Sequence, residues 1–216
     1  VTVPHNKHQS LPIKIFTIGE ALKTAGYKTG YFGKWHLGFK EENHPKNNGY
    51  DQSYIYSGGG FYQPKFTPEY EFGENKRLSD ILTVMSTDFI ISNKNEPFFL
   101  FLSHYDVHVQ LDADQQIINK FLNKGKIENY PCNAVYSAMI KHLDDSVGAI
   151  MKSIEKEGLY ENTIFIFYSD NGGVDNRYDN IPLIAERSLH NYPESHPLRF
   201  VATSNTPLRS GKGTLY

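Results

Sequence analysis

The stretch GKWHLG at residues 33–38 places a cation, an indole and an imidazole side by side between glycines. Lys34 could neutralise a tetrahedral oxyanion, and His36 is suited to general acid-base chemistry near neutral pH. Lys212 also lies between glycines, in RSGKG at residues 209–213, where the backbone could approach a ligand closely. One lysine or one histidine is more often solvated or structural, so only a coincidence of such groups indicates a site.

Hard oxygen ligands occur together in the stretch SDNGG at residues 169–173. Asp170 and Asn171 offer oxygens suited to Ca²⁺ or Mg²⁺, and the glycines that follow would let the backbone turn around a bound ion. Two ligands do not complete such a site, and Asp, Asn and Gly also dominate ordinary turns. The stretch therefore favours a cation site and a plain turn about equally.

Other candidate groups are weaker. His104 and His108 belong to one loop, and spacing does not say which of them faces a substrate. His142 falls inside a helical pattern, which favours a surface or packing role. The adjacent carboxylates Asp144-Asp145 would point about 100° apart on a helix and are interpreted as solvated. Cys132, the only cysteine, has no recognisable nucleophile context and excludes an internal disulfide.

The elements that must position these groups alternate between helix and strand. Thr17 and Glu20 form a capping-box pattern that begins a helix ended by Gly26, and residues 27–32 form the next strand. Residues 41–68 are rich in turn residues and favour loop and short strand. Apolar periodicity then predicts helices over 78–90, 114–122 and 140–154, the last stopped by Gly158, and buried strands over 97–102 and 163–168.

The candidate groups all follow predicted strands. Lys34 and His36 come after the first strand, the two histidines of one loop after the second, and Asp170 and Asn171 after the third. A parallel sheet gathers the carboxyl ends of its strands at one edge, where α/β proteins bind ligands. We therefore expect these groups to meet at one rim.

Length and charge limit the function classes. With 216 residues and 39% hydrophobic residues, the chain can form one ordinary domain with a real core. Its 22 basic and 24 acidic residues give a net charge of −2, so no large field attracts nucleic acid or an anionic membrane. No apolar run of about 18 residues predicts a membrane segment, and the opening residues lack the order of a signal peptide.

Four blocks together resemble the sulfatase family of the alkaline-phosphatase-like superfamily. They are GYKTGYFGKWHLG at 26–38, PFFLFLSHYDVH at 97–108, YSDNGG at 168–173 and PLRSGKGTLY at 207–216. The segment from Tyr136 to Gly148 is similar to the family's helix before the metal-binding strand. The resemblance implies an α/β, alkaline-phosphatase-like core with a mainly parallel sheet flanked by helices. Residues 1–216 would form part of a sulfatase catalytic domain.

The resemblance also implies site roles, which fall on six residues. Asp170 and Asn171 correspond to ligands of Ca²⁺ or Mg²⁺, Lys34 and Lys212 to sulfate-binding cations, His36 to the histidine that contacts the nucleophile, and His108 to the leaving-group histidine, assisted by Lys212. Gln110 stands where the family commonly has proline, which leaves the shape of that loop open. The residues at 50–72, rich in Tyr and Gly, are candidates for substrate recognition.

The implied reaction is attack on sulfur by the hydroxyl of a hydrated formylglycine. We expect the Cys/Ser-x-Pro-x-Arg segment that yields formylglycine, and an upstream Asp-Asp pair, to lie before Val1, and the family's C-terminal part to follow Tyr216. On this interpretation the chain is an internal fragment with no turnover of its own. The resemblance to the family implies a location in the periplasm, the lysosome or the cell exterior. The sequence does not indicate an oligomeric state.

Three functions remain open. The first is hydrolysis of a sulfated carbohydrate or an aryl sulfate, which the combination of GKWHLG and SDNGG favours. The second keeps the fold and changes the ester, as in phosphonate or phosphate ester hydrolases and phosphoryl transferases of the same superfamily. The third is a noncatalytic relative that binds sulfated glycans, which the joint retention of all six site residues disfavours.

Overall fold

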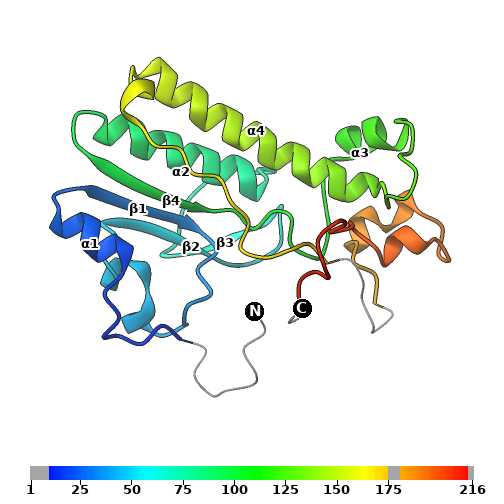
Figure 1. Ribbon diagram of the computed structural model, residues 1–216, viewed down its shortest axis with the longest axis horizontal. Helices are drawn as coiled ribbons and strands as arrows, with labels where there is room; N and C mark the ends of the chain where they lie inside the picture. The colour runs from blue at the N-terminus through cyan, green and yellow to red at the C-terminus, as the bar shows by residue number, and fades with distance from the viewer. Residues whose placement is uncertain (1–9, 175–180, 214–216) are drawn as a thin grey trace. The chain divides into compact units, whose positions relative to one another are not determined.

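The computed structural model describes residues 10–174 and 181–213 and divides into two compact units. The sheet unit comprises residues 10–105 and 145–164, and the loop-rich unit comprises residues 106–144 and 165–213. Helix α4 (Ala134–Lys156) contributes residues to both units. Figure 1 shows the order of the elements along the chain.

The sheet unit is built on four strands in the order β3-β2-β1-β4. They are β1 (Lys28–Gly33), β2 (Gln52–Gly58), β3 (Lys65–Thr67) and β4 (Phe98–Ser103). β1 is parallel to both β2 and β4, and only β3 is antiparallel. The prediction of an α/β fold with a mainly parallel sheet is therefore confirmed.

Helices α1 (Ile18–Thr24) and α2 (Leu78–Asn93) pack beside this sheet (Figure 1). The predicted capping box begins α1, because the backbone N–H of Glu20 donates to Oγ1 of Thr17 at 3.1 Å and the N–H of Thr17 donates to the Glu20 carboxylate at 2.8 Å. Gly26, at φ 88°, ends the helix as expected. The chain then enters β1.

Alternate residues of β1 face two separate parts of the core. Phe32 is fully buried and packs edge-on against Phe89 of α2, with ring centroids 6.0 Å apart. Tyr31 points to the opposite face, where its ring lies 4.9 Å from Trp35 and 5.2 Å from Tyr50. This period-two alternation lets one short strand bury aromatic rings on both faces of the sheet.

The second half of α4 covers the β4 side of the sheet unit. Ile150 and Ile154 are buried with Ile90 of α2, and Phe98 and Leu100 of β4 pack against them. The predicted apolar face is covered in part, since Ile140 and Met151 of the same set are exposed. Gly158, at φ 71°, follows the helix at the predicted stop.

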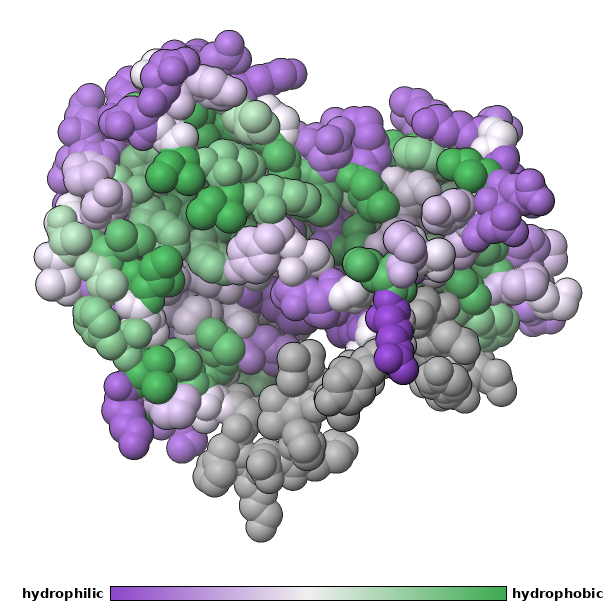
Figure 2. All heavy atoms as spheres, viewed as in Figure 1, coloured by the Kyte–Doolittle hydropathy of each residue, from purple (hydrophilic) through white to green (hydrophobic). Residues whose placement is uncertain are grey.

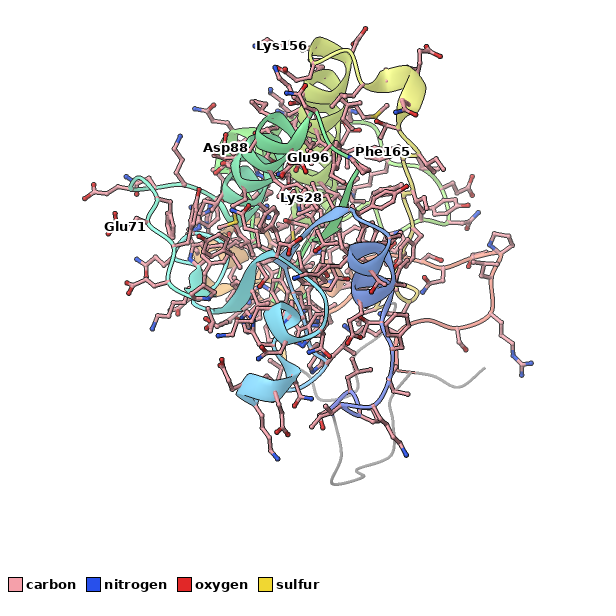
Figure 3. All side chains as sticks on the ribbon, turned by 90° about the vertical axis from the view of Figure 1, so that its left-hand side faces the viewer. Lys28, Glu71, Asp88, Glu96, Lys156 and Phe165 are labelled. Carbon is pink, nitrogen blue, oxygen red and sulfur yellow. The ribbon has the colours of Figure 1, made fainter. Side chains whose placement is uncertain are left out.

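Exposed ion pairs link the ends of these elements. Lys28 at the start of β1 and Glu96 before β4 lie close together in Figure 3, with Nζ 3.5 Å from the carboxylate. Both side chains are about half exposed, so this pair adds less than about 1 kcal/mol of stability. The pair lies where β1 and β4 begin side by side.

Asp51 connects the start of β2 to the start of β1. Its carboxylate accepts hydrogen bonds from the backbone N–H of Thr29 at 3.0 Å and from its hydroxyl at 2.9 Å, and lies 2.7 Å from Nζ of Lys23. Burial by itself would raise the pKa of Asp51. The hydrogen bonds from Lys23 and Thr29 outweigh burial and hold this pKa below its usual range.

We expect the Asp51→Asn variant to lose about 1 kcal/mol of unfolding free energy at pH 7, because charge-assisted hydrogen bonds become neutral ones and the exposed ion pair adds little. The folded-state pKa is depressed, so the stabilisation is present above the unfolded-chain pKa of about 3.9 and is lost as pH falls through the folded pKa. Urea unfolding of both proteins at pH 7 and at about pH 3 measures this. A difference that stayed constant with pH would contradict it.

One predicted strand does not form. Residues 163–168 were expected to make a buried strand, but in the structure they have no strand pairing, and Ile164 and Ile166 are 89% and 76% exposed. The prediction of a buried strand is therefore wrong for this structure. An apolar run becomes a strand only through hydrogen bonds to a neighbouring strand, and none of the four described strands pairs with this run.

The loop-rich unit contains α3 (Gln115–Leu122), the first part of α4 and short 3₁₀ helices. In the whole described chain the 3₁₀ helices are η1 (Glu41–Asn43), η2 (Pro45–Asn47), η3 (Tyr160–Asn162), η4 (Glu186–Asn191) and η5 (Pro197–Arg199). No helix in the described part of the chain is long and apolar enough to cross a lipid bilayer.

Buried polar contacts hold the loop-rich unit together. The N–H of Leu111 donates to the carbonyl of Leu183 at 2.7 Å, which joins two distant segments. Beside it, the buried carboxylate of Asp112 accepts hydrogen bonds from Nε of Arg187 at 2.9 Å and from the hydroxyl of Ser188 at 2.6 Å. The buried charge is thus compensated, as a low-dielectric site requires.

Asn133 caps helix α4 and is 2% exposed. Its Oδ1 accepts hydrogen bonds from the backbone N–H groups of Val135 at 3.0 Å and Tyr136 at 3.2 Å. Its Nδ2 donates to the carbonyls of Leu198 at 2.8 Å and Val201 at 3.0 Å. One side chain therefore satisfies two orphan donors of the helix and two carbonyls of a later segment.

We expect Asn133→Ala to lower the free energy of unfolding by about 2 kcal/mol, the sum of a lost N-cap and of carbonyls left without a donor. Asn133→Ser keeps a capping oxygen and should lose about 1 kcal/mol. Chemical denaturation of the two variants and the parent protein measures both values. Equal losses in the two variants would show that the cap contributes nothing.

Candidate active site

The carboxyl ends of β1 and β4 form the corner that carries Lys34. The two strands are in register at Gly33 and Ser103, and the backbone N–H of Lys34 donates to the Ser103 carbonyl at 2.8 Å. The Tyr31 hydroxyl in turn donates to the Lys34 carbonyl. The backbone of Lys34 is therefore held from both sides, and its half-buried side chain leaves from a fixed point.

His36 lies two residues further along the same loop and is exposed. Its backbone has φ 56°, a left-handed conformation that non-glycine residues adopt rarely and often at functional positions. Its imidazole lies 6.4 Å from the Phe39 ring, measured between centroids. Both groups predicted in GKWHLG are thus placed at the expected strand end within the sheet unit.

His104, directly after β4, takes part in a hydrogen-bond chain inside the sheet unit. Its Nε2 lies 3.1 Å from the hydroxyl of Ser146, which lies 2.5 Å from the hydroxyl of Thr83. The Thr83 hydroxyl also donates to a backbone carbonyl of α2 at 2.6 Å. This chain occupies one ring nitrogen and favours a structural role for His104, a point that sequence left open.

His108 belongs to the loop-rich unit and is half-buried. Its Nδ1 lies 2.6 Å from the carbonyl of Val109 and donates to it. His104 differs from it, since its Nε2 lies 3.1 Å from the hydroxyl of Ser146 in helix α4.

The structure brings the SDNGG and GKG segments together within the loop-rich unit. Asn205 holds Gly173 of the first segment, since its Oδ1 accepts from the N–H of Gly173 at 2.9 Å and its Nδ2 donates to the Gly173 carbonyl at 2.9 Å. The backbone N–H of Lys212 donates to the same carbonyl at 3.1 Å. Asp170 and Lys212 are both exposed on these joined segments.

Asn205 was not identified from the sequence. It lies in Ser204-Asn205-Thr206-Pro207, where asparagine is the ordinary residue of a turn, so no sequence signal separated it from other loop residues. Only the pairing with Gly173 shows its role. A Cβ at Gly173 would lie 2.4 Å from the Thr203 side chain, so this close approach also needs glycine.

Asp170 and Asn171 fit a hard cation in the kind of donor that they offer. Both supply side-chain oxygens, as Ca²⁺ and Mg²⁺ prefer, but Ca²⁺ takes six to eight ligands. Within residues 10–174 and 181–213 no cluster of three or more His, Cys, Asp or Glu side chains suits a metal ion. The two residues therefore provide part of a coordination sphere, and the metal site stays a prediction.

The remaining candidates have packing or surface roles. His142 is buried, and its Nε2 accepts a hydrogen bond from the backbone N–H of Asp114 at 3.4 Å, as the packing interpretation predicted. Asp144-Asp145 are exposed, as expected for a solvated pair. The Cys132 sulfur accepts a hydrogen bond from the N–H of Ile127 at 3.3 Å.

A literal Ser-x-Pro-x-Arg match occurs inside the chain, which corrects the expectation that this pattern would lie only before Val1. It is Ser195-His196-Pro197-Leu198-Arg199. The Arg199 guanidinium donates to the carbonyls of Tyr192 at 3.1 Å and Leu189 at 3.3 Å, and the His196 ring accepts from the Leu198 N–H at 3.1 Å. These local bonds explain the residues as parts of a structural turn.

The site residues are thus divided between the two units. Lys34 and His36 lie in the sheet unit, and His108, Asp170, Asn171 and Lys212 lie in the loop-rich unit. The meeting of all six at one rim stays a prediction. Residues 214–216, which end the block PLRSGKGTLY, and the opening residues 1–9 lie outside the described residues.

A mostly parallel α/β sheet whose following loops carry lysine and histidine is typical of enzymes that bind ligands at the sheet edge. The chain belongs to the sulfatase family, since the family model described as Sulfatase matches residues 2–215.

Individual relatives agree with this family. The chain is 27% identical to a Formosa agariphila protein named Sulfatase, over 84% of this chain and 43% of that one. It is 28% identical to mouse N-acetylgalactosamine-6-sulfatase, over 79% of this chain and 34% of that one. The chain therefore spans less than half the length of these curated relatives.

A solved structure supports the fold. A crystal structure of Ps i-CgsB in complex with k-i-k-neocarrahexaose is similar with a TM-score of 0.66 and 27% identity, over 78% of this chain and 42% of that one. The alkaline-phosphatase-like α/β fold that the sequence implied is therefore confirmed.

Proposed function

We propose that this chain forms part of the catalytic domain of a sulfatase that hydrolyses a sulfate ester of a carbohydrate or an aryl alcohol. The family match over residues 2–215 carries this proposal, because it spans every segment that holds a candidate site residue. The local geometry supports it, since Lys34 follows β1 at a fixed corner and the Lys212 segment is hydrogen-bonded to the segment of Asp170.

Two lysines would bind the sulfate group. Lys34 and Lys212 would each supply positive charge that stabilises the negative charge growing on the sulfuryl oxygens and the leaving oxygen in the transition state. Both follow glycines, so the backbone near them leaves space for a tetrahedral anion. Their contribution is electrostatic and needs no proton transfer.

Two histidines would serve as a proton donor and as a hydrogen-bond partner of the nucleophile. His108 would donate a proton to the leaving alcohol as the ester S–O bond breaks, with its ring oriented by the contact of Nδ1 with the Val109 carbonyl. His36, exposed beside Lys34, would hydrogen-bond the nucleophilic group and orient it.

Two further groups, a divalent cation and a nucleophile, would complete the site. Asp170 and Asn171 would hold a Ca²⁺ or Mg²⁺ ion, which when bound supplies positive charge next to the sulfate. The nucleophile would be a formylglycine hydrate, which supplies a hydroxyl, and we propose that it lies outside these 216 residues. Ser195, in its hydrogen-bonded structural turn, would remain unmodified.

A sulfated sugar is the substrate class that we propose first. One relative is named N-acetylgalactosamine-6-sulfatase, and one similar structure contains k-i-k-neocarrahexaose. Exposed aromatic rings near the β1 corner, such as Phe39, would suit the apolar face of a sugar ring. A phosphate or phosphonate ester and a noncatalytic glycan-binding role are the alternatives.

The test compares ester classes on one protein. The complete product of the gene that encodes this chain, and the 216-residue chain itself, are assayed for sulfate release from p-nitrocatechol sulfate and from sulfated galactosamine and carrageenan oligosaccharides, with and without Ca²⁺. Matched phosphate and phosphonate esters serve as controls. We expect sulfate release by the complete product and none by the 216 residues alone.

Other outcomes discriminate among the functions. Faster hydrolysis of the phosphate or phosphonate esters would replace sulfatase by the second function. Binding of sulfated oligosaccharides without any turnover would favour the noncatalytic role. Mass spectrometry of the peptide that contains Ser195 should show no loss of about 2 Da, the change from a hydroxymethyl to a formyl side chain. That loss, or turnover by the 216 residues alone, would place the nucleophile inside this chain.

A further inference from the structure

The ammonium group of Lys34 lies over an aromatic ring. Its Nζ is 5.3 Å from the centroid of the Tyr105 ring, within the range of a cation–π interaction. Tyr105 is two residues past the end of β4, and Lys34 is one residue past the end of β1. The parallel register of these strands therefore puts the cation and the ring at the same corner.

The Tyr105 ring is itself fixed by two other rings. Its centroid lies 4.7 Å from that of Tyr56 and 5.4 Å from that of Phe61. The Tyr56 hydroxyl accepts a hydrogen bond from the N–H of Gly60 at 3.1 Å, which holds the turn after β2 against it. Burial raises the pKa of Tyr105, so its phenol stays neutral over the whole physiological range.

A second cation supports the other end of this aromatic group. The Arg77 guanidinium is 1% exposed and lies 4.7 Å from the centroid of Phe61, and its Nη1 donates to the Ser79 hydroxyl at 2.8 Å. The sheet unit thus contains a row of Arg77, Phe61, Tyr105 and Lys34, in which two rings separate two cations. Lys34 is the cation of this row that lies at the carboxyl ends of β1 and β4.

We propose that Tyr105 is a positioning residue that holds the Lys34 ammonium in place for the sulfate group. A lysine stem has several rotatable bonds, and fixing it costs rotamer freedom that a bound anion would otherwise have to overcome. The ring attracts the ammonium through its face and leaves the positive charge in place. This inference rests on the proposed function, in which Lys34 binds sulfate.

The test measures the lysine directly as well as the reaction. The complete gene product carries ¹³C-methyl groups on its lysines, and the Lys34 signal is assigned by its absence in Lys34→Arg. We expect an upfield ring-current shift of this signal in the parent protein and in Tyr105→Phe, and its loss in Tyr105→Leu. The Tyr160→Leu variant, which removes an exposed tyrosine of the sheet unit, should leave the signal unchanged.

Activity and binding are measured on the same proteins. We expect Tyr105→Leu to weaken inhibition by inorganic sulfate and to lower kcat/KM for p-nitrocatechol sulfate by about two- to fivefold, the range of one cation–π contact. Tyr105→Phe keeps the ring and should stay within about twofold of the parent protein on the same scale. The rescue by phenylalanine separates a ring effect from loss of the hydroxyl.

Each other result has one meaning. An unshifted Lys34 signal in the parent protein, or the same signal in Tyr105→Leu, would overturn the positioning role; the first of these needs no variant to fold. A Tyr105→Phe variant as weak as Tyr105→Leu would overturn it in favour of the hydroxyl. A shifted signal in a protein that neither binds nor hydrolyses sulfate esters would overturn the proposed function and leave the contact standing.

Discussion

Replacing Lys34 with methionine is expected to lower kcat/KM for an aryl sulfate by about 10²- to 10³-fold, the usual effect of removing one preorganised charge-stabilising group from a site. Methionine keeps much of the apolar stem that packs at the β1–β4 corner. The free energy of unfolding should therefore change by less than about 1 kcal/mol. Steady-state kinetics and urea unfolding of the same preparation measure the two quantities.

A matched control is available in the same loop. Lys40 is largely exposed and its Nζ lies 3.6 Å from the Glu42 carboxylate, so Lys40→Met removes one charge without touching the corner. We expect Lys40→Met to retain activity within about twofold, as a surface change does. Equal losses in the two variants would mean that net charge, and not Lys34 itself, supports the reaction.

Replacing Gly33 with alanine is expected to have the largest effect on stability, about 3 to 4 kcal/mol. Gly33 ends β1 at φ 106°, a conformation that disfavours any side chain. A Cβ there would lie 2.0 Å from the backbone carbonyl oxygen of Ser103. Because that oxygen accepts the hydrogen bond from Lys34, relieving the clash would also displace the candidate sulfate-binding residue.

The control for this variant is Gly58→Ala. Gly58 ends β2 at φ 125°, and a Cβ there would have no atom within 4 Å. Gly58→Ala should therefore lose only the free energy of placing a side chain at positive φ, about 1 to 2 kcal/mol. Thermal or urea unfolding of both variants isolates the contribution of the close approach. A Gly33→Ala loss no larger than that of Gly58→Ala would show that β1 and β4 can separate at this corner without cost.

The sheet unit exposes several large apolar side chains to solvent. Ile13, Phe16, Ile18 and Phe39 are all exposed. Figure 2 shows apolar residues grouped on the face of the molecule that carries β1 and α1. A continuous exposed apolar area of this kind favours association, so unfolding measurements on destabilised variants belong at low protein concentration.

Local signals in the sequence were sufficient for most of the helices and for strands β1 and β4. The capping box at Thr17 and Glu20 and the glycine at 26 act over a few residues, so α1 and the start of β1 follow from the sequence. The 78–90 periodicity likewise gave α2 to within three residues of its end. Such elements depend on contacts close in sequence, which a pattern can report.

The run 163–168 shows where this reasoning stops. Its composition is that of a buried strand, yet the structure leaves it unpaired and exposed. Strand formation depends on a neighbour that supplies hydrogen bonds, and no property of this six-residue run specifies whether that neighbour is present. The hydrogen bond between Gly173 and Asn205 in the candidate site could not be predicted from the sequence either, because the two residues are 32 positions apart.

The sequence by itself determined the residue types at the site, the family to which its four blocks point and the helices that frame β1. Tertiary structure alone decided which groups those residues touch. It placed the Tyr105 ring under Lys34, turned His104 toward Ser146 and joined Lys212 to Gly173. Each of these contacts joins segments far apart in the chain, and their strength depends on distance and burial in three dimensions, which spacing along the sequence does not encode.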